Sequence, residues 1–439
     1  MENKPKIIIV IGATASGKST VAHQICKRFN GELINADVMQ CYKGARIGTN
    51  KPTEEEKKEF HYHLIDFVDP SINYSVSQWV EACDNEIELI LNNEKMPVIC
   101  GGTSFYIDSL LFRHSSEIES EKEIGNEIEN GKVIEIENGN EIEIIRNENG
   151  NEEIKKENEI NEIQLPWDQH EWYSQLEQLD KPMATKLHPN DTIRIKNALM
   201  YYLKHKKPLS ETLLSDEIII KYNPIIVWVD ADVELLDKRA EIRVDQMINE
   251  GMTKENLTFL QENEKAMEQL EWKWGICMAI GLREYIPLYK QQCTEEDVKD
   301  AIKTHTKQYI RKQLRWIQNR MIQTRKCHLL HHVHNGETIL QLDSIYEQIE
   351  QCLQSPTYYF QQSSIDNGNT TNEMTIDNKA LEKKNLLEWK KYSCDICGKI
   401  LNGENEWNIH LRSKGHKAKK KQLKKVHEQH RKHIDENDC

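Results

Sequence analysis

The chain of 439 residues lacks several features that mark common classes of protein. It has no apolar run of about 20 residues, the length that a membrane-spanning helix needs, so such a helix is excluded. We expect no secretory or separate transit peptide, because a strand-like apolar segment already begins at Lys6. The 11 cysteines are scattered except for one close pair, Cys394 and Cys397, so we predict reduced thiols and an intracellular protein.

The formal net charge of −14 is unevenly distributed along the chain. Residues 115–164 hold 16 acidic and 5 basic residues, a balance of −11, whereas residues 379–433 hold 16 basic and 6 acidic residues, a balance of +10. The densest acidity thus lies in one segment and the basicity in a C-terminal module, so the charge of the whole chain says little about partners.

Hydrophobic patterning predicts an α/β core that is interrupted by other segments. Apolar runs at 6–11, 32–35, 97–100 and 225–230 alternate with helical patterns, which is typical of a mostly parallel sheet. The predicted organisation is the first part of the core at 1–114, an acidic insertion at 115–164, a helical subdomain at 165–224, the remainder of the core with C-terminal helices at 225–353, a polar linker at 354–380, a small module with a basic extension at 381–433 and a tail at 434–439.

The acidic insertion, residues 115–164, consists of near-repeats of Glu, Ile, Asn and Gly. This composition buries little apolar surface and repels itself, which favours a disordered surface insertion. The alternative is a solvated β-hairpin with isoleucines on one face. Under either interpretation the segment is not expected to carry chemistry.

The most informative motif is a phosphate-binding loop between a predicted strand and a predicted helix. It fits the pattern G-x-x-x-x-G-K-[ST], in which backbone N–H groups surround phosphate, the lysine adds a positive charge and the hydroxyl holds Mg²⁺. We assign diphosphate binding to Gly12, Ala13, Thr14, Ala15, Ser16, Gly17, Lys18, Ser19 and Thr20, and Mg²⁺ to Ser19. The motif does not say which phosphate compound binds.

A second motif, near the C-terminus, predicts a structural zinc site. Cys394-x2-Cys397-x12-His410-x5-His416 fits the C₂H₂ spacing at every interval. Four protein ligands fill a tetrahedral site, so the zinc is structural and not catalytic. Lysines crowd the second histidine, which favours nucleic acid as the partner, with a protein partner or a nuclear address as alternatives.

Further polar segments follow the predicted strands. Asp37 comes directly after the second strand, where a carboxylate faces the phosphate-binding loop in such folds. Gly101-Gly102-Thr103 follows another strand, with small residues and a hydroxyl at the same edge. Other distinctive segments are Asp37-x-x-Gln40-x-Tyr42, Gly48-Thr49-x-Lys51-Pro52, His188-Pro189-Asn190-Asp191, Gly281-Leu282-Arg283-Glu284 and Gln308-Tyr309-x-x-x-Gln313-Leu314-x-Trp316.

With these segments in this order, the chain resembles the tRNA dimethylallyltransferases over about residues 6–114 and 165–320, and the finger matches the eukaryotic branch of that family. The resemblance implies an α/β fold: a P-loop core with a parallel sheet, an inserted or appended helical tRNA-binding region and a small C₂H₂ finger. It also implies transfer of a dimethylallyl group from dimethylallyl diphosphate to N6 of adenosine 37 in the tRNA anticodon stem-loop. The acidic insertion is foreign to the family pattern.

The resemblance gives chemical roles to several residues. Asp37 is expected to take the proton of the poorly nucleophilic exocyclic amine as the C–N bond forms. The loop N–H groups, Lys18, Mg²⁺ and an arginine stabilise the diphosphate leaving group; Arg243 is the better candidate for that arginine and Arg239 the second. Thr103 is expected to line the reaction channel.

The target base must leave its stack, so base flipping is expected. The predicted tRNA contacts are Asp37, Val38, Met39, Gln40, Ile193, Arg194, Ile195, Lys196, Asn197, Arg283, Arg311, Lys312 and Arg315. For most of the basic side chains a solvated surface role is the alternative, and Tyr309 and Trp316 are expected to be core residues. We expect a cytoplasmic monomer, with a mitochondrial or nuclear pool as a further option.

Two other functions compete with this one. A nucleotide or small-molecule kinase would need an arginine-rich lid and a purine pocket, and no clear lid segment is found in the sequence. A non-catalytic RNA-binding protein with a relic phosphate loop would not need Lys18, Ser19 and Asp37, all of which are present.

Overall fold

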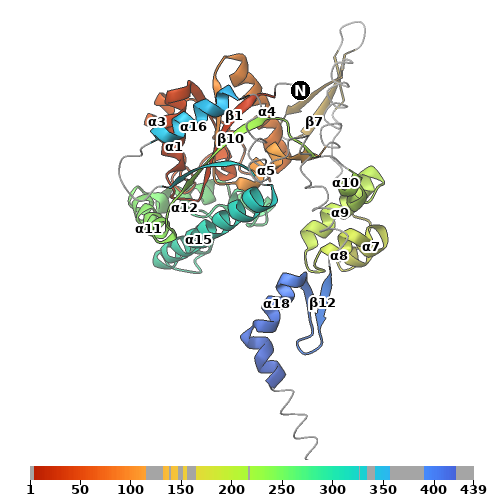
Figure 1. Ribbon diagram of the computed structural model, residues 1–439. Coiled ribbons are helices and arrows are strands. Elements are labelled where there is room, and N and C mark those ends of the chain that lie inside the picture. Colours follow the sequence, from red (N-terminus) through yellow and green to blue (C-terminus); the bar gives the residue numbers. More distant parts are fainter. Residues whose placement is uncertain are drawn as a thin grey trace, which may run out of the picture. The chain divides into compact units, whose positions relative to one another are not determined.

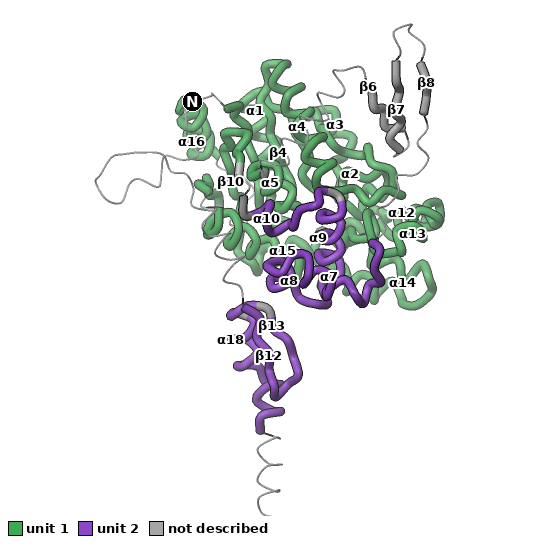
Figure 2. The backbone as a smooth tube through the Cα atoms, turned by 90° about the vertical axis from the view of Figure 1, so that its right-hand side faces the viewer, with its two compact units in different colours: residues 1–113, 219–374 green, residues 114–218, 375–439 purple. Residues whose placement is uncertain are grey.

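The structure is a computed structural model that divides into two compact units, coloured separately in Figure 2. It describes residues 4–114, 132–137, 140–146, 152–155, 165–215, 218–325, 327–333, 342–355 and 390–421. The first unit comprises residues 1–113 and 219–374, and the second comprises residues 114–218 and 375–439. The predicted core segments therefore belong to one unit, and the helical subdomain and finger to the other.

The first unit is built on a six-stranded parallel sheet, which confirms the predicted fold class. Its strand order is β11-β10-β1-β4-β2-β3, with β1 at the centre between β10 and β4. Ile8 of β1 pairs with Ile225 on one side and with Val98 on the other. The strands are β1 (Lys6–Gly12), β2 (Gly31–Asn35), β3 (Tyr62–His63), β4 (Met96–Cys100), β10 (Asn223–Asp230) and β11 (Leu329–Val333).

Both faces of the sheet are buried, which explains the continuous apolar runs of its strands. Ile8 and Val10 pack with Val21 and Ile25 of α1 and with Ile345 of α16, so these two helices cover one face. The alternate side chains of β1, Ile7, Ile9 and Ile11, are fully buried on the opposite face.

The helices of the first unit follow the strands in the expected α/β alternation (Figure 1). Thr53, Ser75 and Thr294 each form a capping box that fixes the start of the following helix. The helices are α1 (Lys18–Phe29), α2 (Val38–Cys41), α3 (Glu54–Glu59), α4 (Val76–Asn92), α5 (Ser104–Leu111), α11 (Val233–Asn249), α12 (Met252–Glu262), α13 (Glu264–Gln269), η1 (Gly275–Met278), α14 (Tyr285–Tyr289), α15 (Glu295–Trp316), η2 (Ile317–Thr324) and α16 (Asp343–Gln354). Among the described residues, no helix has the length and apolar character needed to cross a bilayer.

Two late helices, α11 and α15, lie side by side next to the phosphate-binding loop (Figure 1). Leu236 and Ala240 of α11 and Ile310 of α15 form a buried cluster with Ala13 of the loop. This packing brings α11 and α15 to the edge of the sheet where the loop begins, although both helices come far later in the sequence than the loop.

The second unit contains a small helical core. Leu176, Met183, Leu187, Ile195 and Leu199 are buried together there. Its helices are α7 (Trp172–Leu179), α8 (Lys181–Lys186), α9 (Thr192–His205) and α10 (Leu209–Ser215), and the chain passes between the units near β5 (Arg113–His114) and β9 (Ile218–Ile219).

Within the acidic insertion, the described residues form three antiparallel strands, β6 (Lys132–Glu137), β7 (Asn140–Arg146) and β8 (Glu152–Lys155). The sequence favoured disorder over a hairpin, and these strands are closer to the hairpin alternative. The rest of 115–164, most of the predicted linker and the tail at 434–439 lie outside the described residues.

The C-terminal finger has the two-stranded ribbon and helix that its spacing predicts. It consists of β12 (Lys391–Cys394), β13 (Lys399–Asn402) and α18 (Glu404–Arg412), with β12 and β13 antiparallel.

Candidate active site

The phosphate-binding loop has the backbone conformation of an anion-binding nest. Ala15 and Gly17 adopt left-handed conformations with φ of 67° and 87°, and α1 starts directly after Gly17. A side chain at Gly12 would place Cβ 2.3 Å from the Val229 carbonyl oxygen, so only glycine fits beside β10. The Ser16 hydroxyl is buried without a hydrogen-bond partner, which leaves a polar atom free to meet a ligand.

Asp37 lies beside this loop, at the carboxyl end of β2. It is the N-cap of α2: its Oδ1 accepts a hydrogen bond from the Met39 N–H at 3.2 Å, and its own N–H donates to Asn35 Oδ1 at 3.0 Å. Burial raises the pKa of the Asp37 carboxyl, and the Lys18 ammonium opposes that shift. Asp37 is therefore a helix N-cap, and it also lies in a charged environment that is typical of functional sites.

Two cations face Asp37 from different elements. Lys18 comes from the first turn of α1, and burial lowers the pKa of its ammonium group while the Asp37 carboxylate raises it. Arg243 comes from α11; its Nε is buried without a hydrogen-bond partner, and burial lowers the pKa of its guanidinium while Asp37 raises it. The structure thus brings together three residues that sequence reasoning had placed in one site, from positions 18, 37 and 243.

Arg239 lies one helical turn before Arg243 and reaches the rim of the same loop. Its Nη1 donates to the Ala15 carbonyl oxygen at 3.5 Å. Arg239 therefore contacts the loop backbone, whereas Arg243 presents an unused buried donor. This difference agrees with the order in which the sequence ranked them.

The Gly101-Gly102-Thr103 segment is held against the backbone that carries Asp37. A side chain at Gly101 would place Cβ 2.1 Å from the carbonyl carbon of Ala36, so the two backbones touch. The Thr103 N–H donates to the Ala36 carbonyl oxygen at 3.0 Å, and the Thr103 hydroxyl accepts from the Val38 N–H at 3.3 Å. The Thr103 hydroxyl is thereby fixed on the N–H of Val38, the residue that follows Asp37.

Two residues of α15 belong to this site that the sequence had not assigned to it. Gln313 Oε1 accepts from the Thr14 N–H at 2.8 Å, and Gln313 Nε2 donates to the Gly102 carbonyl oxygen at 2.9 Å. The Tyr309 hydroxyl donates to the same carbonyl oxygen at 3.4 Å. The available signal was polar side chains four residues apart beside the buried Ile310 of the same helix, a spacing that puts both on one face.

A cavity of about 280 Å³ lies beside the first turn of α1 and the end of β2. Ser19, Asn35 and Gln40 line it, together with Cys100, whose thiol pKa burial raises to about 11. The Gln40 amide donates to the Asn50 carbonyl oxygen at 2.8 Å, so one of its donors is engaged within the protein. A larger, apolar hollow around Pro182 and Pro208 in the second unit is far in sequence from these groups and holds none of them.

The basic residues predicted to contact tRNA are mostly exposed. Arg315 and Lys312 of α15 are exposed, whereas Arg311 is held in a two-pronged ion pair with Asp237, and Arg283 pairs with Glu284 at 2.6 Å. In the second unit, Arg194, Lys196, Asn197 and Ile193 are exposed on α9.

Ile195 corrects one expectation. Its side chain is 1% exposed and packs in the core of the helical unit, because it follows the buried face of α9 while its neighbours follow the solvent face. Its side chain therefore offers no surface to RNA. The Val38 side chain is likewise buried, and its N–H is engaged by Thr103.

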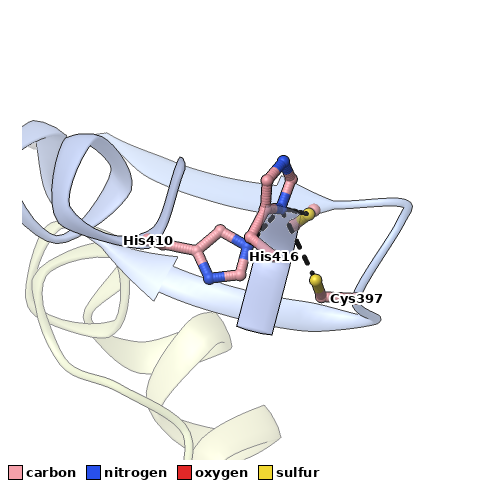
Figure 3. A group of neighbouring side chains, drawn as sticks. Cys397, His410 and His416 are labelled. Carbon is pink, nitrogen blue, oxygen red and sulfur yellow. Dashed lines mark hydrogen bonds between the residues drawn. The ribbon is translucent and has the colours of Figure 1, made fainter. Parts of the chain in front are cut away.

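The finger brings its four predicted zinc ligands together, and Figure 3 labels Cys397, His410 and His416 among them. His416 Nδ1 lies 3.5 Å from the Sγ atoms of Cys394 and of Cys397, and 3.1 Å from His410 Nε2. Tetrahedral zinc with normal bond lengths separates its ligand atoms by about 3.3–3.6 Å, so this donor set fits a structural Zn²⁺.

Comparison with known proteins gives consistent matches. Residues 40–320 match the model of the IPP transferase family, and residues 392–416 match that of a C₂H₂ zinc finger. The chain is 30% identical to a tRNA dimethylallyltransferase of Mus musculus, covering 93% of this chain and 85% of the relative, and 28% identical to one of Saccharomyces cerevisiae, covering 94% and 91%. It is also similar to a crystal structure of a eukaryotic dimethylallyltransferase acting on tRNA, with a TM-score of 0.69, 26% identity and coverage of 97% of this chain and 99% of the other.

Proposed function

Since the chain belongs to the IPP transferase family, we propose that it transfers a dimethylallyl group from dimethylallyl diphosphate to N6 of adenosine 37 in tRNA. The product is N6-(dimethylallyl)adenosine next to the anticodon, with diphosphate as the leaving group. The single observation that carries this proposal is the meeting of Lys18, Asp37 and Arg243 at the mouth of the phosphate-binding loop.

Asp37 is the general base of this reaction. The exocyclic amine of adenine is a weak nucleophile, so a carboxylate that accepts its proton while the C–N bond forms lowers the barrier. A carboxylate whose pKa is raised by burial is a stronger base than one in water, and the nearby Lys18 ammonium favours its charged form. Thr103, fixed next to Asp37, lines the channel and contacts the amine or a diphosphate oxygen.

The loop and the cations stabilise the departing diphosphate. The N–H groups of Ala15 to Ser19, the Lys18 ammonium and the unpartnered Nε of Arg243 are the donors that would stabilise the negative charge developing as the C–O bond breaks. Arg239 supports the loop from its rim. The Ser19 hydroxyl is exposed at the same place, and together with diphosphate oxygens it is a donor set that Mg²⁺ accepts; bound there, the ion would neutralise part of the leaving-group charge.

The tRNA is recognised largely through its phosphates, with the base flipped out of its stack. The exposed Arg194 and Lys196 on α9 and Arg315 on α15 are the basic contacts we favour. Met39 and Gln40 follow Asp37 in the short helix α2 and are the residues that we assign to the flipped adenine. The finger, folded around zinc and rich in lysine, adds affinity for RNA.

We further propose a monomer that works in the cytoplasm, with an additional mitochondrial or nuclear pool. The lysine-rich segment after His416 supports the nuclear pool. Light scattering of the purified protein and fractionation of cells that express a tagged chain test these two points.

The decisive experiment is transfer of radiolabelled dimethylallyl diphosphate to an unmodified anticodon stem-loop. An otherwise identical RNA with guanosine at position 37 is the substrate control, and the Asp37→Asn protein is the enzyme control. Label on the adenosine 37 RNA with the wild-type protein alone supports the reaction and its base. Absence of label on any RNA, with Mg²⁺ present and the finger loaded with zinc, would refute the proposal.

A further inference from the structure

Gln313 joins the two loops of the site through both polar atoms of its side-chain amide. Its side chain is 4% exposed and lies between the phosphate-binding loop and the Gly101-Gly102-Thr103 segment. It accepts from Thr14 and donates to Gly102, at 2.8 Å and 2.9 Å. In the part of the chain that the structure describes, no strand pairing joins these two segments at that point, since β1 and β4 pair only from Ile8↔Val98 to Val10↔Cys100.

The orientation of the Gln313 amide is fixed by its partners. The Thr14 N–H needs an acceptor and the Gly102 carbonyl needs a donor. An amide with its oxygen and nitrogen exchanged would place a donor against the Thr14 N–H and an acceptor against the Gly102 carbonyl oxygen. Glutamate would keep the acceptor but place a charge against a carbonyl oxygen, and methionine would fill the same volume with neither group. Only an amide satisfies both loops at once.

Gly102 is the point at which the Gln313 amide lies against the backbone of the second loop. A side chain at Gly102 would put its Cβ 2.6 Å from Gln313 Nε2 and 3.8 Å from Asp37 Oδ2. The Gln313 amide and the Asp37 carboxylate therefore both lie close to Gly102. Tyr309, one turn earlier on α15, holds the same Gly102 carbonyl oxygen. Because Thr14 donates to Gln313, its N–H is not available to phosphate, and the nest begins after it.

We propose that Gln313 is a positioning residue that sets the distance between the diphosphate held by the phosphate-binding loop and the base held by Asp37 and Thr103. This inference rests on the proposed function, since it assigns the alignment of donor and acceptor to a residue that contacts neither. Loss of the Gln313 bridge between the two loops leaves each loop intact but lets the loops shift relative to one another. A shift of about 1 Å lowers turnover by about 100-fold.

The test compares Gln313→Met with Gln308→Met, the same change at an exposed position of the same helix. We expect Gln313→Met to lower kcat by about 10- to 100-fold while affinity for inorganic pyrophosphate and binding stoichiometry stay at the wild-type level. Gln308→Met should match the wild type in all three. Hydrogen exchange of the peptide that contains Thr14 should quicken by one amide in Gln313→Met only, and Gln313→Glu should restore that protection while recovering kcat in part.

Several outcomes would overturn the proposal. A normal kcat in Gln313→Met, a loss explained by fewer pyrophosphate sites, or unchanged exchange at Thr14 would each show that Gln313 only fills space. If the wild-type protein itself transfers no radiolabelled dimethylallyl group, the proposed function fails. The hydrogen-exchange and pyrophosphate-binding measurements still decide whether Gln313 bridges the two loops.

Discussion

Lys18 and Asp37 each shift the pKa of the other toward the charged form, against the effect of their burial. The lysine comes from the helix that follows β1, and the carboxylate caps a short helix after the next strand along the chain. Removing either charge therefore changes the other residue as well, so the two side chains are best probed by substitutions that keep one property and remove another.

Asp37→Asn separates the base from the cap. Asparagine caps helices as well as aspartate does, so α2 and the folded state should be preserved, whereas proton transfer is lost. We expect turnover to fall by about 10²–10⁴-fold, the usual contribution of a general base, with tRNA affinity retained. Single-turnover transfer and filter binding measure the two quantities. Asp37→Ala should lose the cap in addition and melt at a lower temperature than Asp37→Asn, and normal turnover in both would remove Asp37 from the mechanism.

The pH profile should carry the signature of a carboxyl with a raised pKa. Burial raises the pKa of Asp37, so its protonated form persists to higher pH than for an exposed aspartate. Since only the ionised form accepts the proton, kcat/KM should fall as pH decreases through that raised pKa. A plot of log(kcat/KM) against pH should have a slope of one there, measured over a pH range in which the RNA stays intact. Asp37→Asn should have no such acidic limb. A limb that persists in the variant would assign it to another group.

Lys18→Ala should weaken diphosphate binding. A charged hydrogen bond contributes about 1.5–3 kcal/mol, which corresponds to a loss in affinity of about 10- to 100-fold. Titration calorimetry with inorganic pyrophosphate and Mg²⁺ measures it. Lys27→Ala is the matched control, because Lys27 lies on the same helix as Lys18 and forms an exposed ion pair with Glu59 of α3. This variant should bind pyrophosphate as the wild type does. Equal affinities in the two variants would contradict the assignment of the loop.

Zinc removal should affect RNA binding and spare the diphosphate site. The finger needs its four ligands to fold, whereas the phosphate-binding loop, Asp37 and Arg243 belong to the first unit. Chelation, or truncation from Asn385 onward, should raise the Kd for tRNA more than it lowers turnover on saturating RNA. Pyrophosphate binding is the internal control. If RNA affinity is unaltered, the finger serves a protein partner or localisation instead.

Deleting residues 115–164 should leave transfer activity nearly intact. No residue of the described site comes from this segment, and its composition supplies few apolar groups to a core. The deletion requires a short Gly/Ser connection between His114 and Leu165 to preserve both units. Activity per pyrophosphate-binding site is the measurement, and an inactive but folded deletion would assign a role to the insertion.

Much of the site followed from the sequence because its parts are local motifs. The phosphate-binding loop, Asp37 after a strand and the four zinc ligands each occupy one short segment whose spacing implies its geometry. The edge strands β3 and β11 were not predicted, since short strands with mixed polarity carry little periodic signal. Gln313 was missed for a different reason: its role depends on two loops that lie far away in the sequence, and no local pattern encodes that contact.

The position of β1 at the centre of the sheet has a consequence for synthesis of the chain. Ile8 meets Val98 early, but its other neighbour, Ile225, is translated much later. At about 5–20 residues per second, a ribosome takes on the order of 6–25 s to proceed from Val98 to Ile225. Throughout that interval one edge of the nascent β1 stays unpaired. The phosphate-binding loop is complete only when α11, which carries Arg243, and α15, which carries Gln313, have been translated and packed against it. The enzyme is therefore assembled late in translation, and until then residues 1–114 are a natural client for chaperones that shield strand edges.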